Sequence, residues 1–233
     1  MNWLTRLEVG DVVAIKMQLF DRYSWHQKIW QCFPDRADKN RNEVGFLTRI
    51  EEIEGGFRVW ILSKERPTQP SWYSESTFVT KQISSSFLSH KLYRFDVIAN
   101  PVKTKVNHNL RLDGDGNPIL RANGKPKRIS GKRVLLTHYE DLQNWMDKKA
   151  QDGGFRISSK MPLEVIQITA NRFKKMGKVG ERIQEAWIGG VQFRGVLEVT
   201  NSEKFVDTYQ KGVGKARGFG FGLFLLSPIY SEL

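Results

Sequence analysis

The sequence predicts an α+β protein in which one order of elements, β-α-β-β-α-β, occurs twice along 233 residues. Apolar and β-branched runs of strand length alternate with helical patterns. Capping residues, prolines and paired glycines separate these runs. The second half repeats the element order of the first half without repeating its sequence. This order is that of the ferredoxin-like (RRM-like) fold. We therefore expect two tandem ferredoxin-like domains, at residues 1–90 and 91–233, each of ordinary domain size.

In the first half, Asp21 is a suitable N-cap for a helix at residues 22–33, and Pro34 cannot continue that helix. A short helix is expected after Pro70, in an otherwise ambiguous segment. Apolar and β-branched runs predict strands around these helices, and Gly55-Gly56 marks a hairpin. The expected strands are residues 12–19, 43–53 and 57–63.

In the second half, residues 91–100 alternate well enough for a strand, which Pro101 ends. A Gly-, Asn-, Asp- and Lys-rich excursion follows, and we expect it to form a hairpin that turns at Asp113–Gly116. Two helices come later, one ended by Gly153-Gly154 and one capped by Asn201 or Ser202. The expected helices are residues 139–151 and 203–211, and the expected strands are 163–170, 187–200 and 223–229.

The composition points to a polyanionic partner. The chain has 37 Lys and Arg against 25 Asp and Glu, a net charge of +12 and a pI near 9.8. RNA or DNA is the first candidate, an anionic membrane surface is the second, and a basic protein with no such partner is the third. The single Cys32 excludes a disulfide framework and a cysteine zinc site. No signal peptide or membrane-length apolar run is present, so we expect a reducing cytoplasm.

The positive charge is concentrated in two blocks and one loop. Residues 91–133 hold eleven Lys or Arg against three Asp, and Arg172–Arg182 is rich in glycine and cations. Such blocks can be solvated loops, but together they favour a shared phosphate-contacting surface. The candidate RNA-binding residues are Lys103, Lys105, Lys132, Arg133, Arg172, Lys174, Lys175, Lys178, Lys215 and Arg217.

The densest motif is near the end of the chain. The run from Arg217 to Phe224 nearly matches the RNA-recognition-motif signature, with Gly222 in place of valine. That signature belongs on an internal strand, whereas only nine residues follow Phe224. We therefore predict a loop between the last helix and the last strand, both structural and phosphate-contacting, since successive amides can cradle phosphate. Its glycines are Gly212, Gly214, Gly218, Gly220 and Gly222.

We expect no metal and no other cofactor. The four histidines show no pair at ligand spacing. The run Asp113–Asn117 imitates a calcium loop, but Pro118 and Gly124 stand where that loop needs glycine and a bidentate acid. A phosphodiester enzyme would here use general acid–base chemistry.

One pair of residues suits such chemistry. Tyr23 and His26 are three residues apart on the predicted helix and share a face. Histidine can accept or donate a proton near neutral pH, and tyrosine can hold a reacting hydroxyl. The same face, which includes Trp30, is also compatible with half-buried packing. The core stripe beside it would then consist of Trp25, Ile29 and Phe33.

Four segments, in one order along both halves, carry a resemblance to a known family. They are Asp21–Asp35, Tyr93–Lys103, the stretch from Gly131-Lys-Arg133 through Trp145 to Phe155, and Gly212–Gly222. Together they resemble the CRISPR-associated endoribonucleases that process precursor crRNA in Cascade-type complexes, with subtype I-E as the nearest match.

The resemblance implies metal-independent cleavage of a repeat RNA beside its stem-loop. The RNA 2′-hydroxyl would attack the adjacent phosphate, leaving 5′-hydroxyl and 2′,3′-cyclic phosphate ends. His26 falls on the family's catalytic histidine, and Tyr23 falls on a tyrosine that supports it. Asn171–Arg182 best matches a basic hairpin that meets the stem, whereas residues 104–130 depart from the family's compact pattern. The implied partners are the repeat RNA and other Cascade-like subunits.

The chemistry is thus expected at the other end of the chain from the glycine-rich loop, which would help to position RNA. Two other functions stay open. Because ferredoxin-like folds host both enzymes and binding modules, the chain could be a non-catalytic stem-loop-binding subunit. A binder of duplexes or membranes driven only by charge is the third hypothesis.

Overall fold

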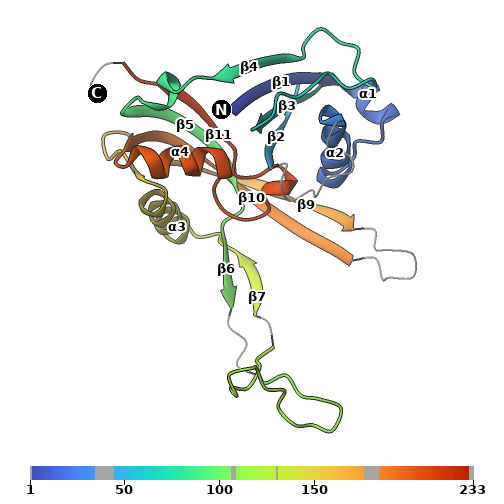
Figure 1. Ribbon diagram of the computed structural model, residues 1–233, viewed down its shortest axis with the longest axis vertical. Coiled ribbons are helices and arrows are strands. Elements are labelled where there is room, and N and C mark those ends of the chain that lie inside the picture. Colours follow the sequence, from blue (N-terminus) through green and yellow to red (C-terminus); the bar gives the residue numbers. More distant parts are fainter. Residues whose placement is uncertain (1, 35–44, 106–108, 130, 176–183, 231–233) are drawn as a thin grey trace.

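Two antiparallel sheets form the body of the molecule, and a long arm projects from it (Figure 1). The computed structural model describes residues 2–34, 45–105, 109–129, 131–175 and 184–230. Within residues 169–175 and 184–188 it describes the backbone without the side chains.

The first sheet has the order β2-β3-β1-β4. Its strands are β1 (Asn2–Gly10), β2 (Phe46–Ile53), β3 (Gly56–Ser63) and β4 (Val79–Ile83). Two helices connect β1 to β2, α1 (Asp11–Lys16) and α2 (Arg22–Ile29), and the 3-10 turn η1 (Trp30–Cys32) continues α2. Trp25 and Ile29 of α2 share a buried cluster with Val59 and Ile61 of β3. α2 is therefore fixed to the sheet by the predicted core stripe.

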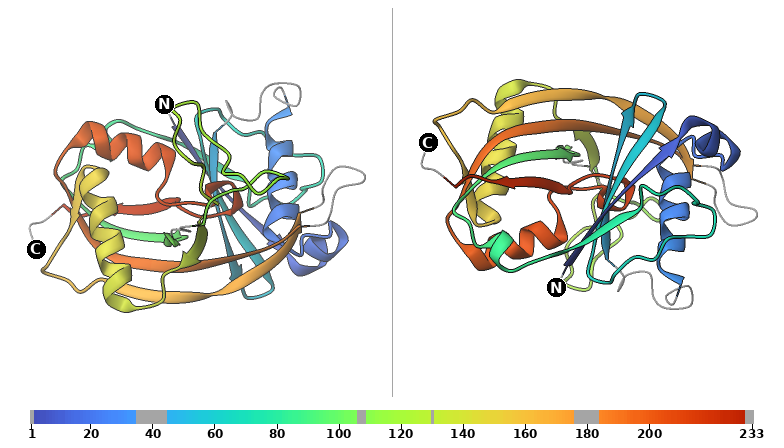
Figure 2. Two further views of the ribbon diagram at one scale, coloured as in Figure 1. Left: turned by 90° about the horizontal axis from the view of Figure 1, so that it is seen from below. Right: turned by 90° about the horizontal axis from the view of Figure 1, so that it is seen from above.

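The second sheet has the order β11-β5-β10-β8, and β9 pairs with the other end of β10. Two helices, α3 (Tyr139–Asp152) and α4 (Ser202–Lys211), lie together on one face of it (Figure 2). A short 3-10 turn, η3 (Ser86–Leu88), precedes this half. The strands are β5 (Leu92–Ala99), β8 (Phe155–Ile157), β9 (Glu164–Lys175), β10 (Gln184–Val199) and β11 (Phe224–Pro228).

Both sheets have the same strand order. If the strands of each sheet are numbered along the chain, the first sheet read from β4 and the second read from β11 both have the order fourth, first, third, second. In the second sheet β8 and β9 share the second position, because each pairs with one end of β10. All the pairings within them are antiparallel. This arrangement confirms the predicted α+β, ferredoxin-like class.

Local signals placed several boundaries correctly. The carboxylate of Asp21 accepts the Ser24 amide at 2.7 Å and begins α2, as predicted. The Asn201 side chain accepts the Lys204 amide at 3.0 Å and begins α4. α3 ends at Gly153-Gly154, where Gly154 has a φ of +76°.

The strand predicted at residues 12–19 is wrong, because the first strand is β1 and residues 11–16 form α1. β1 ends at Gly10, opposite the first residue of β3, Gly56, so no partner remains for the residues that follow. Val12 and Ile15 are 80% and 64% exposed. β-branched residues indicate a strand only where a sheet can bury them.

The short helix predicted after Pro70 is also wrong. Residues 64–78, all of them described, form turns and irregular segments. One side-chain bond holds this segment against β1, where the Tyr73 hydroxyl donates to the Glu8 carbonyl at 2.7 Å. Another lies within the segment, where the Gln69 side-chain amide donates to the Tyr73 carbonyl at 2.9 Å. These bonds replace the backbone bonds of a helix.

The excursion after β5 is an arm, of which the structure describes residues 102–105, 109–129 and 131–135. It is built on the ribbon of β6 (Val102–Lys105) and β7 (Lys132–Leu135). The turn predicted at Asp113–Gly116 is present, since the Gly116 amide donates to the Asp113 carbonyl. The arm is more than a single hairpin, however, because a second turn follows at Arg121–Gly124.

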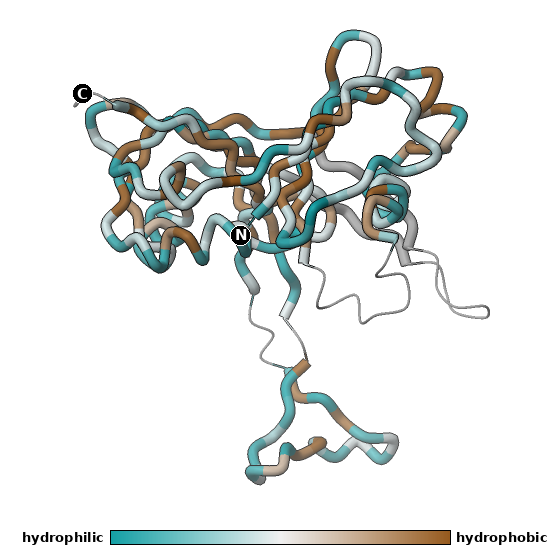
Figure 3. The backbone as a smooth tube through the Cα atoms, turned by 45° about the horizontal axis from the view of Figure 1, so that its top comes forward, coloured by the Kyte–Doolittle hydropathy of each residue, from teal (hydrophilic) through white to brown (hydrophobic). Residues whose placement is uncertain are grey.

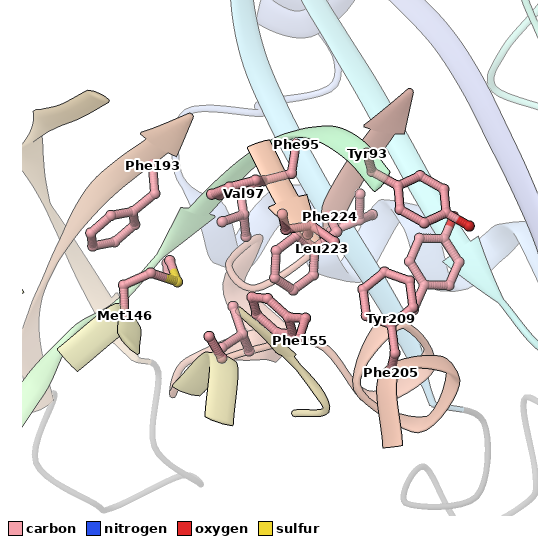
Figure 4. Close-up of a cluster of buried hydrophobic side chains, with 14 of the residues drawn as sticks. Tyr93, Phe95, Val97, Met146, Phe155, Phe193, Phe205, Tyr209, Leu223 and Phe224 are labelled. Carbon is pink, nitrogen blue, oxygen red and sulfur yellow. The ribbon is translucent and has the colours of Figure 1, made fainter. Parts of the chain in front are cut away.

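The larger core joins the two sheets. Leu47 of β2 and Leu62 of β3 belong to the same buried cluster as Tyr93, Phe155 and the other side chains of Figure 4. In that view Phe205 and Tyr209 of α4 point toward Tyr93 of β5. Figure 3 shows the same distribution, with hydrophobic segments gathered in the body and mostly hydrophilic ones along β6 and β7. The shared core fixes the position of β2 relative to the second sheet.

Candidate active site

The candidate site is centred on His26, in the last turn of α2. The core stripe of Trp25 and Ile29 is buried, which turns Tyr23 and His26 to the partly exposed side of the helix. The imidazole lies among three aromatic rings. Its ring centroid is 6.0 Å from that of Trp30, 5.4 Å from Phe46 and 6.3 Å from Phe219.

Trp30 orients the imidazole. Its indole Nε1–H donates to His26 Nε2 at 2.9 Å. An indole N–H can only donate, so Nε2 accepts in this arrangement, and a neutral imidazole carries its proton on Nδ1. The half-buried packing face expected for Tyr23, His26 and Trp30 is therefore present in part, and it also gives the histidine a defined tautomer.

The glycine-rich loop reaches α2, although the two are at opposite ends of the sequence. Its 3-10 turn, η4 (Arg217–Phe219), lies against α2 and β2. Arg22 donates from Nη1 to the Phe219 carbonyl at 3.1 Å, and its guanidinium lies 4.4 Å from the centre of the Phe221 ring. Gly218 borders the imidazole, because a Cβ built there would lie 3.8 Å from His26 Cε1. The separation expected between the chemistry and this loop is thus a separation in sequence only.

Arg22 is the main link between helix and loop. Burial lowers the pKa of its guanidinium below the usual value, and the charge of Glu52 opposes that effect. Arg22 also lines a pocket of about 450 Å³, together with residues of α1 and α2 and with Phe57 and Glu52. Arg22 therefore has its cation partly withdrawn from water and aimed at the loop backbone rather than at solvent.

The loop lies between α4 and β11, as predicted, and much of its backbone is already bonded. Amides of Gly212, Val213, Phe219, Gly220 and Gly222 donate to protein carbonyls. These five amides do not form the phosphate cradle that its composition suggests. Four of the five predicted glycines, all except Gly218, have φ between +72° and +86°. The loop is thus a rigid wall beside His26.

We expect Gly222→Ala to destabilise the protein. Gly222 has a φ of +86°, and a Cβ there would collide with the Val213 carbonyl. The left-handed conformation alone costs an alanine about 1–2 kcal/mol. Urea unfolding would measure this loss of stability. Gly114→Ala is the matched control, because nothing lies within 4 Å of that position. Equal losses in the two variants would contradict this role for the loop.

The predicted RNA-binding residues fall into three groups. Lys105, Lys132 and Arg133 are exposed on the β6–β7 ribbon, whereas Lys103 there forms an ion pair with Asp141 of α3 at 3.2 Å. Lys215 is exposed on the glycine-rich loop, and the exposed Arg217 donates to the Lys211 carbonyl at 2.6 Å. The third group is on or beyond β9 and comprises Arg172, Lys174, Lys175 and Lys178.

For Arg172, Lys174 and Lys175 the described structure gives backbone positions only, and Lys178 lies outside the described residues. β9 contacts α2, so the strand that carries the first three approaches the helix of His26 (Figures 1 and 2). The arm extends away from this region. The structure therefore brings β9 and the loop to His26, but not the arm.

An ion-pair network that joins the two sheets was not predicted from the sequence. Arg49 of β2 is 1% exposed and donates from Nη1 to Asp96 Oδ1 of β5 at 2.7 Å, across the two sheets. Gln192 and Arg194 of β10 also donate to Asp96, both at 3.0 Å. Burial raises the pKa of Asp96, but the hydrogen bond and charge of Arg49, with the bonds from Gln192 and Arg194, hold it below its ordinary value.

Within the described part of the chain, no three His, Cys, Asp or Glu side chains are grouped so that they could hold a metal ion. None of the described helices is both long enough and apolar enough to span a bilayer.

Comparisons with known proteins agree over nearly the whole chain. The family model described as CRISPR associated protein matches residues 2–228. The CRISPR system Cascade subunit CasE of Escherichia coli is 28% identical over 223 residues, which cover 95% of this chain and 99% of CasE. The CRISPR-associated endoribonuclease Cse3 of Thermus thermophilus is 24% identical over 238 residues, covering 97% of this chain and 100% of Cse3.

The fold is similar to that of a solved structure of the CRISPR endoribonuclease Cse3 bound to a 19-nucleotide RNA. The TM-score is 0.69 at 23% identity, with 97% of this chain and 100% of that chain covered. This similarity agrees with the ferredoxin-like strand order of both sheets. Because the family model spans both sheets and the helix of His26, the chain belongs to the CRISPR-associated protein family.

Proposed function

We propose that this protein is a site-specific endoribonuclease that cleaves the stem-loop repeat RNA of a CRISPR array to give mature crRNA. The observation that carries the proposal is His26, held by Trp30 and bordered by the glycine-rich loop, in a chain of this family. The relatives CasE and Cse3 support it, since one is named as a Cascade subunit and the other as an endoribonuclease. Repeat RNA and Cascade-like subunits are accordingly the proposed partners, and the cytoplasm is the proposed location.

The proposed reaction is attack of an RNA 2′-oxygen on its own 3′-phosphorus. The new P–O bond closes a 2′,3′-cyclic phosphate, and the P–O5′ bond breaks to leave a 5′-hydroxyl. His26 transfers a proton as general base or acid, and Tyr23 holds a reacting hydroxyl. Cations beside the phosphate, with Lys215 as the exposed candidate on the loop, stabilise the charge of the pentacoordinate phosphorus.

We also propose that the chain divides into two domains, with the boundary between residues 90 and 91.

Cleavage of a stem-loop repeat RNA in EDTA tests this function. We expect full cleavage with the chelator and a 5′-hydroxyl product. The same RNA with a 2′-deoxy nucleotide at the scissile position should bind with equal affinity and remain uncut, because it lacks the nucleophile. Cleavage of the deoxy RNA at that position would contradict 2′-hydroxyl attack.

One observation favours the alternative of a non-catalytic stem-loop-binding subunit. Nε2 of His26 accepts the Trp30 indole, so this nitrogen would have to change partner before it could accept a substrate proton. The same experiment separates the two functions. Tight stem-loop binding without cleavage under any condition would support the subunit and end the enzyme proposal.

A further inference from the structure

The far end of the arm contains one eight-residue pattern twice. Leu112–Ile119 reads LDGDGNPI, and Leu120–Lys127 reads LRANGKPK. Both segments have leucine first, glycine fifth and proline seventh. The two repeats follow each other without a gap, so their shared positions can be compared directly.

The two repeats also share one backbone structure. In each, the leucine pairs with the proline six residues on, as Leu112 with Pro118 and Leu120 with Pro126. The second residue of each repeat donates its amide to the sixth, at 2.9 Å in both cases. The fifth residue, a glycine, donates to the second and has φ of +84° in one repeat and +75° in the other. The chain itself therefore shows that this turn tolerates different side chains at its other positions.

The repeats differ most in charge. At positions two, four, six and eight, the first repeat has Asp113, Asp115, Asn117 and Ile119, and the second has Arg121, Asn123, Lys125 and Lys127. The Asp113 carboxylate is used within its own turn, where it accepts the amides of Asp115 and Asn117. The second repeat is exposed throughout. One framework thus displays an acidic surface and then a cationic one.

The two repeats occupy the tip of the arm, apart from the body and from α2 (Figure 1). Exposed cations on the β6–β7 ribbon, Lys105, Lys132 and Arg133, lead toward this tip. The tip also exposes leucines, but Leu112 and Leu120 occupy equivalent positions and are 53% and 59% exposed, so they do not distinguish the repeats. The repeats are distinguished by charge instead. The second repeat has three exposed cations, Arg121, Lys125 and Lys127, and no acidic residue. Such a surface fits a phosphodiester backbone rather than an apolar protein surface.

We propose that the second repeat, Leu120–Lys127, contacts the phosphates of RNA that extends beyond the stem-loop held near His26. This inference rests on the proposed function for the nature of the substrate. The tip is distant from α2, so the contact adds affinity and leaves the chemical step unchanged. Single-stranded phosphates are the expected target, because a flexible strand can follow a small projecting turn.

A repeat exchange tests the proposal. Arg121→Asp, Asn123→Asp, Lys125→Asn and Lys127→Ile together give the second repeat the residues of the first at positions two, four, six and eight, and leave Ala122 in place. The probes are a repeat stem-loop RNA alone and the same RNA with single-stranded extensions on both sides, each with a 2′-deoxy nucleotide at the scissile position so that it binds without being cut. We expect affinity for the extended RNA to fall at least about tenfold, with the salt slope smaller by about 2, near 0.7 for each lost contact. Affinity for the stem-loop alone should not change.

The reverse exchange is the matched control. Asp113→Arg, Asp115→Asn, Asn117→Lys and Ile119→Lys should raise the affinity for extended RNA and steepen its salt dependence. Unchanged circular dichroism and thermal unfolding would show that both variants fold. Equal affinity and salt slope for wild type and the first variant on extended RNA would overturn the proposal, as would an equal loss on the stem-loop alone. Failure of wild type to cleave would instead count against the enzyme function, because these comparisons measure binding.

Discussion

Replacing His26 with alanine is expected to abolish repeat RNA cleavage while the stem-loop still binds. A positioned acid or base contributes about 10²–10⁴-fold to a proton-transfer step, so the single-turnover rate should fall by at least that range. Binding should persist because the glycine-rich loop is anchored by Arg22, which donates to the Phe219 carbonyl independently of the imidazole. Single-turnover cleavage and equilibrium binding of one RNA would measure the two effects separately.

His90→Ala is the control for this experiment. His90 packs against Tyr93 and Tyr230, with ring centroids 6.1 and 5.0 Å away, and takes no part in the site at α2. Its loss should leave the cleavage rate unchanged. Tyr23→Phe should slow cleavage less than His26→Ala, because it removes a hydroxyl but not the proton carrier. A normal rate in His26→Ala would end the assigned mechanism.

The local part of the candidate site was predictable from sequence because its signals are local. Asp21 as N-cap fixes where α2 begins, and helical spacing then determines which residues share a face. Trp30 follows His26 by four residues, so helical spacing predicts that the two side chains are neighbours. No sequence pattern predicts that the indole donates to the imidazole. Packing decides that bond, since Phe46 of β2 adjoins both rings.

The meeting of α2 with the glycine-rich loop was not predictable. Arg22 and Phe219 are 197 residues apart, and their contact depends on how the two sheets are joined. The ion pair of Arg49 and Asp96 was not predictable for the same reason. In the sequence each is an ordinary charged residue on a strand, and they pair only because the two sheets pack together. A single sequence has no signal for such pairs.

The wrong predictions arose where tertiary contacts outweighed propensity. Val12 and Val13 favour a strand, but β1 ends at Gly10 and leaves them no partner. In the segment after Pro70, the hydroxyl of Tyr73 bonds to β1 and so fixes an irregular path. The arm was predicted as an excursion, but its second turn was not predicted. The two turns share only a leucine, a glycine and a proline at fixed spacing, and three such residues are too few to indicate a hairpin.

Replacing Arg49 with methionine is expected to produce a large loss of stability. The change removes the 1%-exposed partner of Asp96 and leaves a partly buried carboxylate facing the seam between the sheets. Removing one member of a buried ion pair costs about 3–5 kcal/mol in free energy of unfolding when the other charge is left unpaired. The loss here should not exceed that range, because Gln192 and Arg194 still donate to Asp96. β2 also carries Phe46, which packs on His26. Weaker contact between the two sheets should therefore slow cleavage as well.

The pH dependence distinguishes a lost ion pair from lost packing. The pKa of Asp96 is lowered in the folded protein, so its interactions stabilise the fold above the unfolded pKa of about 3.9 and lose that effect as pH falls through the folded pKa. Without Arg49 the pKa of Asp96 should rise, because burial is then opposed only by the bonds from Gln192 and Arg194. The stability gap between wild type and Arg49→Met should therefore be widest near neutral pH and should narrow as the medium becomes acidic. Urea unfolding at several pH values would measure it.

Arg156→Met is the matched control, because Arg156 pairs with Glu198 on the surface, where its side chain is 66% exposed. Its loss should be far smaller, since water screens an exposed pair. The double variant Arg49→Met and Asp96→Asn should recover part of the stability, because it removes the carboxylate that has lost Arg49 and keeps only Gln192 and Arg194 as partners. A gap that stays constant with pH, or a double variant no more stable than Arg49→Met, would show that Arg49 acts by filling space rather than by holding the charge of Asp96.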